Sequence, residues 1–304
     1  MSKTAQPLWV GFALLGFTAF FSFLSPHFWS LGNLRSIAEQ SSINVIVAVG
    51  MTLVVASAGI DFSSGSAAAL SGVVMALSIR EGWGVGATLG LGLGTGALIG
   101  FMNALLVVRA GITPFMATLT MMNVVAGATL ILTQGIPIYG FSAHFSWFGR
   151  GNVAGIPVSV VAAGFFVIMG LLVLRTRLGV YALALGDNEE ALRRCGVSAD
   201  LYKGVLYVLS GLCASAASVI LTSKLNSAEP LAGVMMEMNA IATVVLGGTR
   251  IQGGVASMTG TLLAALLLGV VRNGLVLIGV SSYYQQFVTG AILLAAVLFS
   301  ERKR

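Results

Sequence analysis

The residues that could carry out catalysis are few and lie far apart in the sequence. No Gly-Lys pair occurs, so the chain lacks a phosphate-binding loop of the Gly-x4-Gly-Lys-Ser/Thr type. With only two histidines, His27 and His144, it has no HExxH motif and no Ser/His/Asp arrangement. Cys195 and Cys213 belong to no CxxC or Cys/His cluster, so we expect no disulfide and no metal site. We therefore expect no enzymatic reaction in this chain.

The polar turn at residues 59–66, Gly-Ile-Asp-Phe-Ser-Ser-Gly-Ser, separates two strongly apolar stretches. A carboxylate at the centre of a membrane helix costs roughly 2.5–3.5 kcal/mol, so Asp61 should lie at a helix break or interface and not face lipid. In one interpretation Asp61 accepts hydrogen bonds from the amides that open the next helix. In the other, Asp61 lines a substrate route together with Ser63, or Asp61 binds a proton. The sequence leaves both interpretations open.

A polar stripe is expected on the apolar stretch that begins at residue 113. Thr113, Thr120, Asn123 and Gly127 fall within roughly 80° of one another on a helix of 3.6 residues per turn. Such a stripe either bonds and packs against a neighbouring helix or faces a hydrophilic path suited to hydroxyl-rich solutes.

Asn239 is a further candidate for such a path. The pattern Asn-x-Ile occurs at residues 44–46 and again at 239–241, each time at the start of a glycine-interrupted apolar stretch. This repetition hints at an internal duplication of the kind that transporters often have.

Lipid must be the main solvent of the elements that position these side chains. Hydrophobic residues make up 57% of the chain and charged residues 9%, with a mean hydropathy of +0.96, whereas soluble domains carry roughly a quarter charged residues. We expect an all-α integral membrane fold in which residues 1–304 form a single transmembrane domain. Ten stretches approach the about 20 residues that a spanning helix needs: 8–28, 41–58, 63–79, 85–108, 113–133, 157–174, 204–222, 238–249, 255–278 and 284–300. The eighth is too short to span alone, so we expect a half-helix or re-entrant piece covered by protein.

The basic residues indicate the orientation of these helices. They are scattered singly between apolar stretches, which favours a topological role over nucleic acid binding. With the N-terminus in the cytoplasm, 11 of the 16 Lys and Arg residues lie inside. The positive-inside rule therefore predicts ten crossings with both termini cytoplasmic. The five basic residues expected outside are Arg35, Arg80, Arg150, Lys224 and Arg272.

The charged loop expected in the cytoplasm, about residues 175–203, contains a short helix at 188–196, Asn-Glu-Glu-Ala-Leu-Arg-Arg-Cys-Gly. Asn188 can cap the first amides, and Gly196 is a natural left-handed stop. Acidic residues come first and basic residues last, as the helix dipole favours, and two Glu-Arg pairs four residues apart add about 0.3–0.5 kcal/mol each. We expect an apolar flank of this helix, formed by Ala191, Leu192, Cys195 and Val197, to be free for a soluble partner, although a solvated loop helix would show the same pattern. The residues of the expected docking element are Asn188, Glu189, Glu190, Leu192, Arg193, Arg194 and Gly196.

These blocks together resemble the ribose-type monosaccharide ABC transporter permease family, within the branched-chain amino acid/sugar permease superfamily. Residues 59–66 are similar to its Gly-Ile-Asp-Leu-Ser-Val-Gly-Ser signature, and residues 113–119, 184–196 and 242–254 are similar to further blocks in the same order. The resemblance covers about residues 41–300. Four residues depart from the family pattern: Phe62, Ser64, Val180 and Asp187. These differences bear on the docking contacts with the partner and not on the architecture of the fold.

The resemblance implies a permease subunit of about ten helices, like those of type II ABC importers, in the bacterial inner membrane. It would pair with a second permease subunit, identical or related, and the helix at 188–196 would couple it to a cytoplasmic ATPase. A periplasmic or extracellular binding protein would deliver the sugar, ATP and Mg would be used by the ATPase, and this chain would need no cofactor. The alternative is an ion-coupled secondary transporter, in which Asp61 or Arg272 is the coupling charge and the helix at 188–196 has no role.

Overall fold

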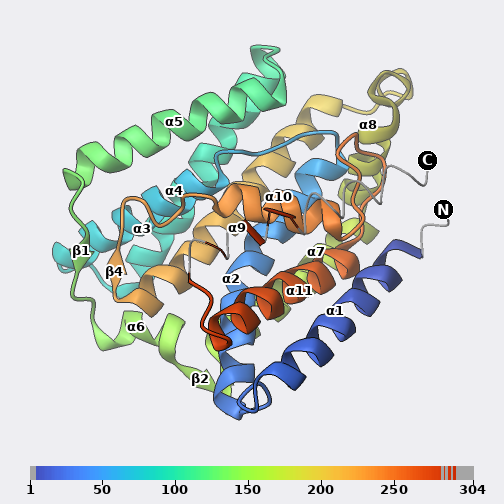
Figure 1. The fold of residues 1–304 in the computed structure, drawn as a ribbon. Coiled ribbons are helices and arrows are strands. Elements are labelled where there is room, and N and C mark those ends of the chain that lie inside the picture. Colours follow the sequence, from blue (N-terminus) through green and yellow to red (C-terminus); the bar gives the residue numbers. More distant parts are fainter. Residues whose placement is uncertain (1–4, 282–283, 285–286, 289, 292–304) are drawn as a thin grey trace.

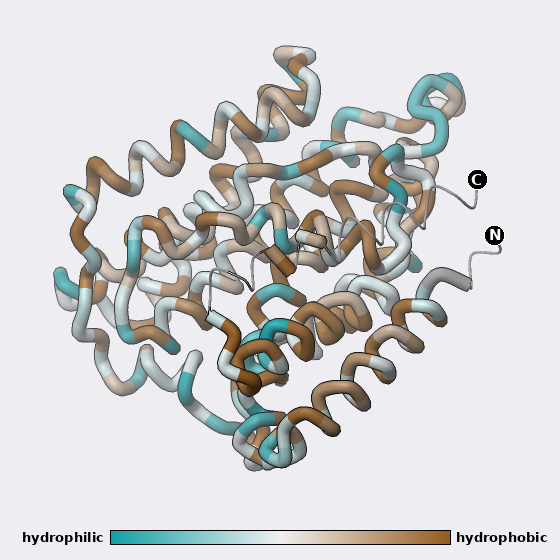
Figure 2. The backbone as a smooth tube through the Cα atoms, in the orientation of Figure 1, coloured by the Kyte–Doolittle hydropathy of each residue, from teal (hydrophilic) through white to brown (hydrophobic). Residues whose placement is uncertain are grey.

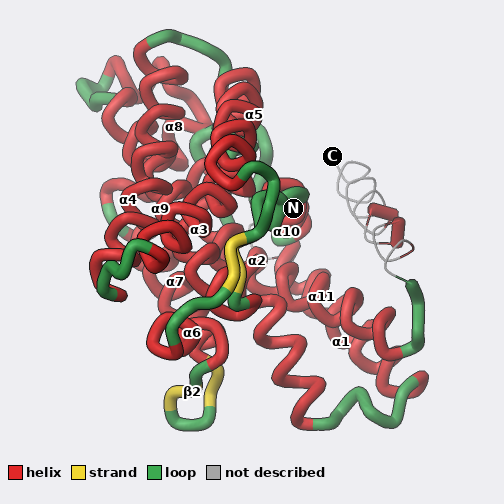
Figure 3. The backbone as a smooth tube through the Cα atoms, turned by 90° about the vertical axis from the view of Figure 1, so that its left-hand side faces the viewer, coloured by secondary structure: helices red, strands yellow, loops and turns green. Residues whose placement is uncertain are grey.

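The computed structural model describes residues 5–281, 284, 287–288 and 290–291, and it is almost entirely helical. The tenth expected span, 284–300, lies largely outside the described residues. Figures 1 and 3 show the helices packed into one bundle, with the few strands in loops at its edge. The helices are α1 (Ala5–Leu24), α2 (Leu31–Ala56), α3 (Ser64–Arg80), α4 (Val85–Ala104) continued by the π-helical η1 (Leu105–Arg109), α5 (Pro114–Thr133), α6 (Ala143–Arg150), α7 (Val158–Arg175), α8 (Arg177–Arg194), α9 (Ala199–Leu225), α10 (Met236–Leu246) and α11 (Met258–Leu277).

Seven of the described helices are long and apolar enough to cross a membrane: α1, α2, α4 with η1, α5, α7, α9 and α11. The first nine expected spans correspond to helices, and α3 and α10 are the two short ones. The expectation of a short eighth span is confirmed, because α10 has 11 residues. Two helices were not expected as separate elements: α6 within the loop after α5, and the long α8.

The strands join loops and build no sheet of their own. β1 (Ile138–Tyr139) pairs with β4 (Ser227–Ala228), and β2 (Asn152–Val153) pairs with β3 (Ile156–Pro157). Ala154 and Gly155 form the tight turn of the second pair with φ of 50° and 83°, as a two-residue hairpin turn requires. Two-residue strands add local pairing to the all-α fold without changing its class.

The centre of the bundle is formed by α2 and α9. In the most apolar stretch of each helix, 72% of α2 and 67% of α9 are buried, against 11% for α1 and 22% for α5. Small residues permit this packing: a methyl group added to Gly96 or Gly100 of α4 would meet backbone atoms of α9. The outer helices α1 and α5 therefore offer surface to lipid or to other chains, and Figure 1 shows them on opposite sides of the bundle.

Two hydrophilic regions lie at opposite ends of the bundle (Figure 2). At one end, Glu39 pairs with Arg35 at 2.8 Å and with Lys224 at 2.9 Å. Arg35 also donates to Asn152 at 2.7 Å, and Arg150 donates to the carbonyl of Lys224 at 2.9 Å. Three of the basic residues expected on one side of the membrane thus meet at one end. The charged residues of α8 lie at the other end.

The break between α2 and α3 lies deep in the bundle. Its carboxylate, on Asp61, bonds to Ser210, which is close to the midpoint of α9. Ser57, Gly59, Asp61 and Ser63 of this irregular segment are buried, whereas Ala58 is exposed. Protein therefore covers most of a stretch that a membrane would not tolerate against lipid. The first turn of α3 also meets the loop before α10, since a methyl group added to Gly65 would meet the carbonyl oxygen of Gly233.

Candidate functional site

Asp61 is the centre of a buried polar network. Its side chain is 1% exposed. Oδ1 accepts hydrogen bonds from the amide and the hydroxyl of Ser63, at 3.0 and 2.7 Å, and Oδ2 accepts one from the hydroxyl of Ser210 at 2.7 Å. Asn103 on α4 donates to Ser63 Oγ at 2.7 Å and, at 3.4 Å, to Asp61 Oδ1. The network therefore ties the start of α3 to α4 and α9.

This geometry supports the structural interpretation of Asp61. The expected bond from an amide at the start of the next helix is present, and the side chain faces no lipid. No lysine, arginine or histidine is paired with Asp61 in the part of the chain that the structure describes. A buried carboxylate without a cation depends on hydroxyl and amide donors, and losing one of them is costly.

Two members of the network were not found from the sequence. Asn103 is a lone amide within an apolar stretch, and a side chain of this kind is a signal for a buried polar contact. Ser210 gives no such signal, because serine is common in membrane helices and often bonds to its own helix. Only the fold places Ser210 opposite Asp61.

The polar stripe lies on the outward face of α5. Thr113, Thr120 and Asn123 are exposed, whereas the opposite face of the helix, including Thr118 and Thr129, is buried against the chain. The stripe therefore makes no packed interface within this chain. The structure leaves it free to face either a second subunit or a solute path.

The six candidate path residues fall into separate places. Asp61 and Ser63 are buried in the network, and the three stripe residues are exposed on α5. Asn239 is half-buried on α10, where its carbonyl accepts a bond from Thr243 at 2.7 Å. Asn44 on α2 donates to the same Thr243 hydroxyl at 2.8 Å, so the two Asn-x-Ile segments meet through one residue.

Two contacts attach α5 to the segment that carries Asp61. The hydroxyl of Thr118 donates to the carbonyl of Ile60 at 3.1 Å. The rings of Phe62 and Phe115 meet edge to face with centroids 5.3 Å apart, an arrangement that aromatic pairs prefer. The segment that carries Asp61 therefore links the buried network to α5, the helix that carries the exposed stripe.

The expected helix at 188–196 is the second part of a longer helix. α8 starts at Arg177, and Asn188 breaks it with φ of −156° and ψ of 96°. Asn188 Oδ1 accepts a bond from the amide of Ala191 at 2.9 Å, so the expected cap is confirmed. Gly196 has φ of +79°, as expected for a left-handed stop. The break, the cap and the stop are therefore encoded locally, and only the preceding helical segment was missed.

Of the expected apolar flank, Ala191 and Cys195 are exposed, whereas Leu192 is covered by the chain itself. Leu192 is 9% exposed and packs with Leu185 and Ala199 of its own chain. The fold brings the start of α9 against the helix, and this partner is not adjacent in sequence. Replacing Leu192 by Asp would therefore disrupt the chain's own packing. The face that remains open to solvent carries Asn188, Glu190, Ala191, Arg194 and Cys195.

Ion pairs hold the same helix to α9. Glu189 pairs with Arg193, at 2.9 Å, and with Lys203, and Arg193 also pairs with Asp200. Burial alone would raise the pKa of the Glu189 carboxyl, but the hydrogen bonds from Lys203 and Arg193 outweigh it and hold the pKa below its ordinary value. The hydrogen bond from Arg193 likewise lowers the pKa of Asp200. Both carboxylates are therefore charged at neutral pH, and the expected Glu-Arg pairs are confirmed, the second being Glu190 with Arg194.

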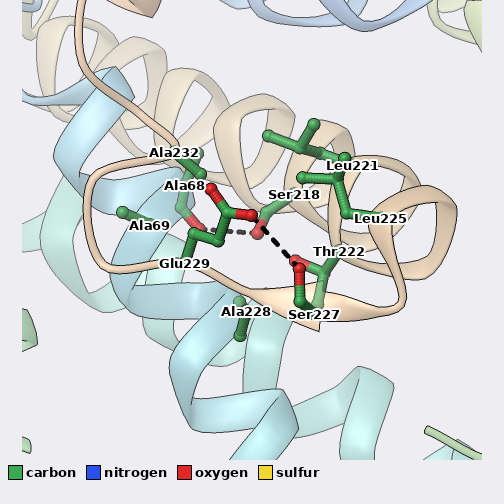
Figure 4. Close-up of a pocket in the computed structure, with 11 residues that line it drawn as sticks. Ala68, Ala69, Ser218, Leu221, Thr222, Leu225, Ser227, Ala228, Glu229 and Ala232 are labelled. Carbon is green, nitrogen blue, oxygen red and sulfur yellow. Dashed lines mark hydrogen bonds between the residues drawn. The ribbon is translucent and has the colours of Figure 1, made fainter. Parts of the chain in front are cut away.

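A pocket lies between α3, α9 and the segment after β4 (Figure 4). Ser218 donates to the carbonyl of Ala68 beside it, and Ser227 donates to Glu229 at 3.4 Å. Its volume of about 10 Å³ holds about one water molecule. This pocket is too small for a sugar in the conformation described.

Comparison with known proteins gives a consistent set of relatives. The ribose import permease protein RbsC of Escherichia coli (strain K12) is 43% identical over 297 residues, which is 96% of this chain and 92% of the relative. The D-allose transport system permease protein AlsC of the same organism is 36% identical, covering 94% and 89%. The galactofuranose transporter permease protein YtfT, also from this organism, is 32% identical, covering 93% and 86%. No solved structure matches the chain.

The family model described as branched-chain amino acid transport system / permease component matches residues 33–297. That range contains the Asp61 network, the stripe on α5 and the kinked helix α8. The chain therefore belongs to the family of branched-chain amino acid transport system permease components.

Proposed function

We propose that this chain is the membrane-spanning permease subunit of a binding-protein-dependent ABC importer for a monosaccharide or a similar small polyol. The observation that carries the proposal is similarity over more than nine-tenths of the chain to import or transport permeases named for ribose, allose and galactofuranose. All three named solutes are sugars. The exposed hydroxyl and amide groups on α5 suit a solute rich in hydroxyls.

ATP and Mg are used in this proposal by a separate cytoplasmic ATPase. Its docking surface is the solvent-exposed face of the helix at 188–194. The helix is held rigid by the Asn188 cap, by charges that match its dipole and by ion pairs to α9. A rigid helix can transmit force from the ATPase, whereas a flexible loop would deform. Leu192 contributes by fixing the helix to its own chain and not by touching the ATPase.

A second permease subunit, identical or related, covers the outward face of α5 in the assembled importer. This face is exposed in the single chain and carries the polar stripe. A solute path between two subunits would be lined by Thr113, Thr120 and Asn123 of each, and Asn239 on α10 is a separate candidate. A periplasmic or extracellular sugar-binding protein delivers the solute at the opposite end from α8.

The importer resides in the bacterial inner membrane with both termini in the cytoplasm. The charge distribution supports this orientation, since 11 of 16 basic residues fall on the cytoplasmic side. The end where Arg35, Arg150 and Lys224 meet then faces outward.

Reconstitution in lipid vesicles tests the proposal. The chain, an ATPase subunit and a binding protein are combined, and uptake of radiolabelled ribose, allose and galactofuranose is measured with and without Mg-ATP on the ATPase side. Uptake of at least one sugar should need the ATPase and ATP. Uptake by the chain alone on a proton or sodium gradient would instead establish the secondary transporter, with Asp61 or Arg272 as the coupling charge.

A further inference from the structure

The helix at 188–194 is joined to the cytoplasmic start of α9 by charge and by packing. Lys203 pairs with Glu189, Asp200 pairs with Arg193, and Leu192 packs against Ala199. These contacts lie on one side of the first turns of α9, since the three residues fall within about 100° of one another on the helix. A displacement of the short helix therefore moves the start of α9 with it.

α9 carries that displacement into the centre of the bundle. It is helical without interruption from Ala199 to Leu225. Ser210 lies about 16 Å along the helix axis from Ala199, at 1.5 Å per residue. There its hydroxyl bonds to Asp61 Oδ2 at 2.7 Å.

Asp61 belongs to the irregular segment at 57–63, which is bonded on its other side to α5. Thr118 bonds to the carbonyl of Ile60 at 3.1 Å, and Phe115 packs on Phe62. The same helix carries the exposed stripe on its opposite face. An unbroken series of contacts thus runs from α8 through α9 and the segment at 57–63 to α5.

We propose that the segment at 57–63 transmits the movement of α8 and α9 to the polar stripe of α5, and that Asp61 and Ser210 are the positioning residues that couple ATP hydrolysis to solute movement. Asp61 keeps its hydroxyl donors throughout such a movement, because a buried polar group left without its hydrogen bond is costly. An apolar contact could slide, whereas a hydrogen-bonded pair must move together. The inference rests on the proposed docking of the ATPase on α8.

Ser210→Ala and Ser218→Ala form a matched pair of variants on α9. Both serines are buried, and both hydroxyls bond across to the α2–α3 region, but Ser218 bonds to the carbonyl of Ala68 and not to Asp61. In the complete importer in vesicles, the measured quantity is radiolabelled sugar moved per ATP hydrolysed. We expect Ser210→Ala to lower this ratio by about tenfold, as the loss of a buried hydrogen bond would. Ser218→Ala should stay within about twofold of the wild type.

A second pair tests the other side of the segment. Thr118→Val removes the hydroxyl that bonds to Ile60, whereas Thr129→Val removes a buried hydroxyl that bonds only within α5 in the described structure. Both replacements keep the shape of the side chain. We expect only Thr118→Val to lower the amount of sugar moved per ATP hydrolysed. If the Ser210→Ala importer does not assemble, the Thr118 and Thr129 variants test the coupling role of the segment at 57–63.

Wild-type ratios in the assembled Ser210 and Thr118 variants would overturn the inference while leaving the proposed function in place. Equal losses in a test variant and its control would also overturn it, because a general loss of packing explains that result. A wild-type complex that moves no sugar with ATP would refute the proposed function, and the inference with it.

Discussion

Gly65 and Gly233 bring two backbones into direct contact where the first turn of α3 meets the loop before α10. A methyl group on Gly233 would meet the carbonyl carbon and oxygen of Gly65, and one on Gly65 would meet Gly233 and the carboxylate of Glu237. Neither position has room for a side chain. The first turn of α3 is thus covered by the loop that leads into α10.

Gly233→Ala should therefore destabilise the fold by about 1–3 kcal/mol, the usual effect of overpacking at a tight site. The control is Gly164→Ala on α7, where nothing lies within 4 Å of the added methyl and alanine favours the helix. Thermal unfolding of the purified chain in detergent measures both. A melting temperature for Gly233→Ala equal to that of Gly164→Ala would contradict the close contact.

Ala191→Asp should weaken binding of the ATPase without unfolding the chain, because Ala191 lies on the solvent-exposed face of the short helix. A new carboxylate buried at an interface is costly when it is unpaired, so we expect at least a tenfold weaker association, roughly 1.4 kcal/mol. Ala154→Asp, in the exposed hairpin at the other end, is the control. Copurification of the ATPase with each variant is the measurement, and unchanged recovery with Ala191→Asp would rule out this docking face.

Thr120→Leu and Asn123→Leu should slow sugar import while leaving assembly with the ATPase intact. Both side chains are exposed on the stripe, and leucine removes their hydrogen-bonding groups without disturbing the buried face of α5. We expect about a tenfold loss for the double variant. Val124→Leu, on an exposed neighbouring position, is the matched control. Normal import by the double variant would mean that the stripe serves packing against another chain.

The ion pairs between α8 and α9 should make stability depend on pH. The pKa of Glu189 is lowered in the folded chain, so the unfolded chain binds more protons in acid and the stabilisation is lost as the pH falls through the lowered pKa. Wild type should thus melt higher than Glu189→Gln near neutral pH, and the difference should shrink at acidic pH. If the difference in melting temperature between wild type and Glu189→Gln does not change with pH, the ionised Glu189 carboxylate does not stabilise the fold.

Labelling of the two native cysteines tests the orientation of the chain in the membrane. Cys195 is exposed beside the short helix and Cys213 is buried. An impermeant maleimide applied to intact cells should leave Cys195 unlabelled and should label it once the membrane is opened. A cysteine introduced at the exposed Ala154 should react in intact cells. The reverse result would place α8 outside and invert the predicted topology.

The helices and their local ends could be read from the sequence because they depend on nearby residues. Apolar stretches long enough to span gave the first nine helical positions, and the cap at Asn188, the stop at Gly196 and the Asp61 bond to the next helix follow from short-range geometry. Even the short α10 is marked by the length of its apolar stretch. These features need no knowledge of what packs against them.

Contacts between distant segments were decided by the tertiary structure alone. Asp61 accepts a hydrogen bond from Ser210, which lies 149 positions away in the sequence. Leu192 is buried because the start of α9 packs against it. No local pattern distinguishes Ser210 from other serines, or a leucine that faces its own chain from one that faces a partner. A hydrogen bond or a buried contact forms where the packed helices place two side chains together, and that placement is a property of the whole bundle.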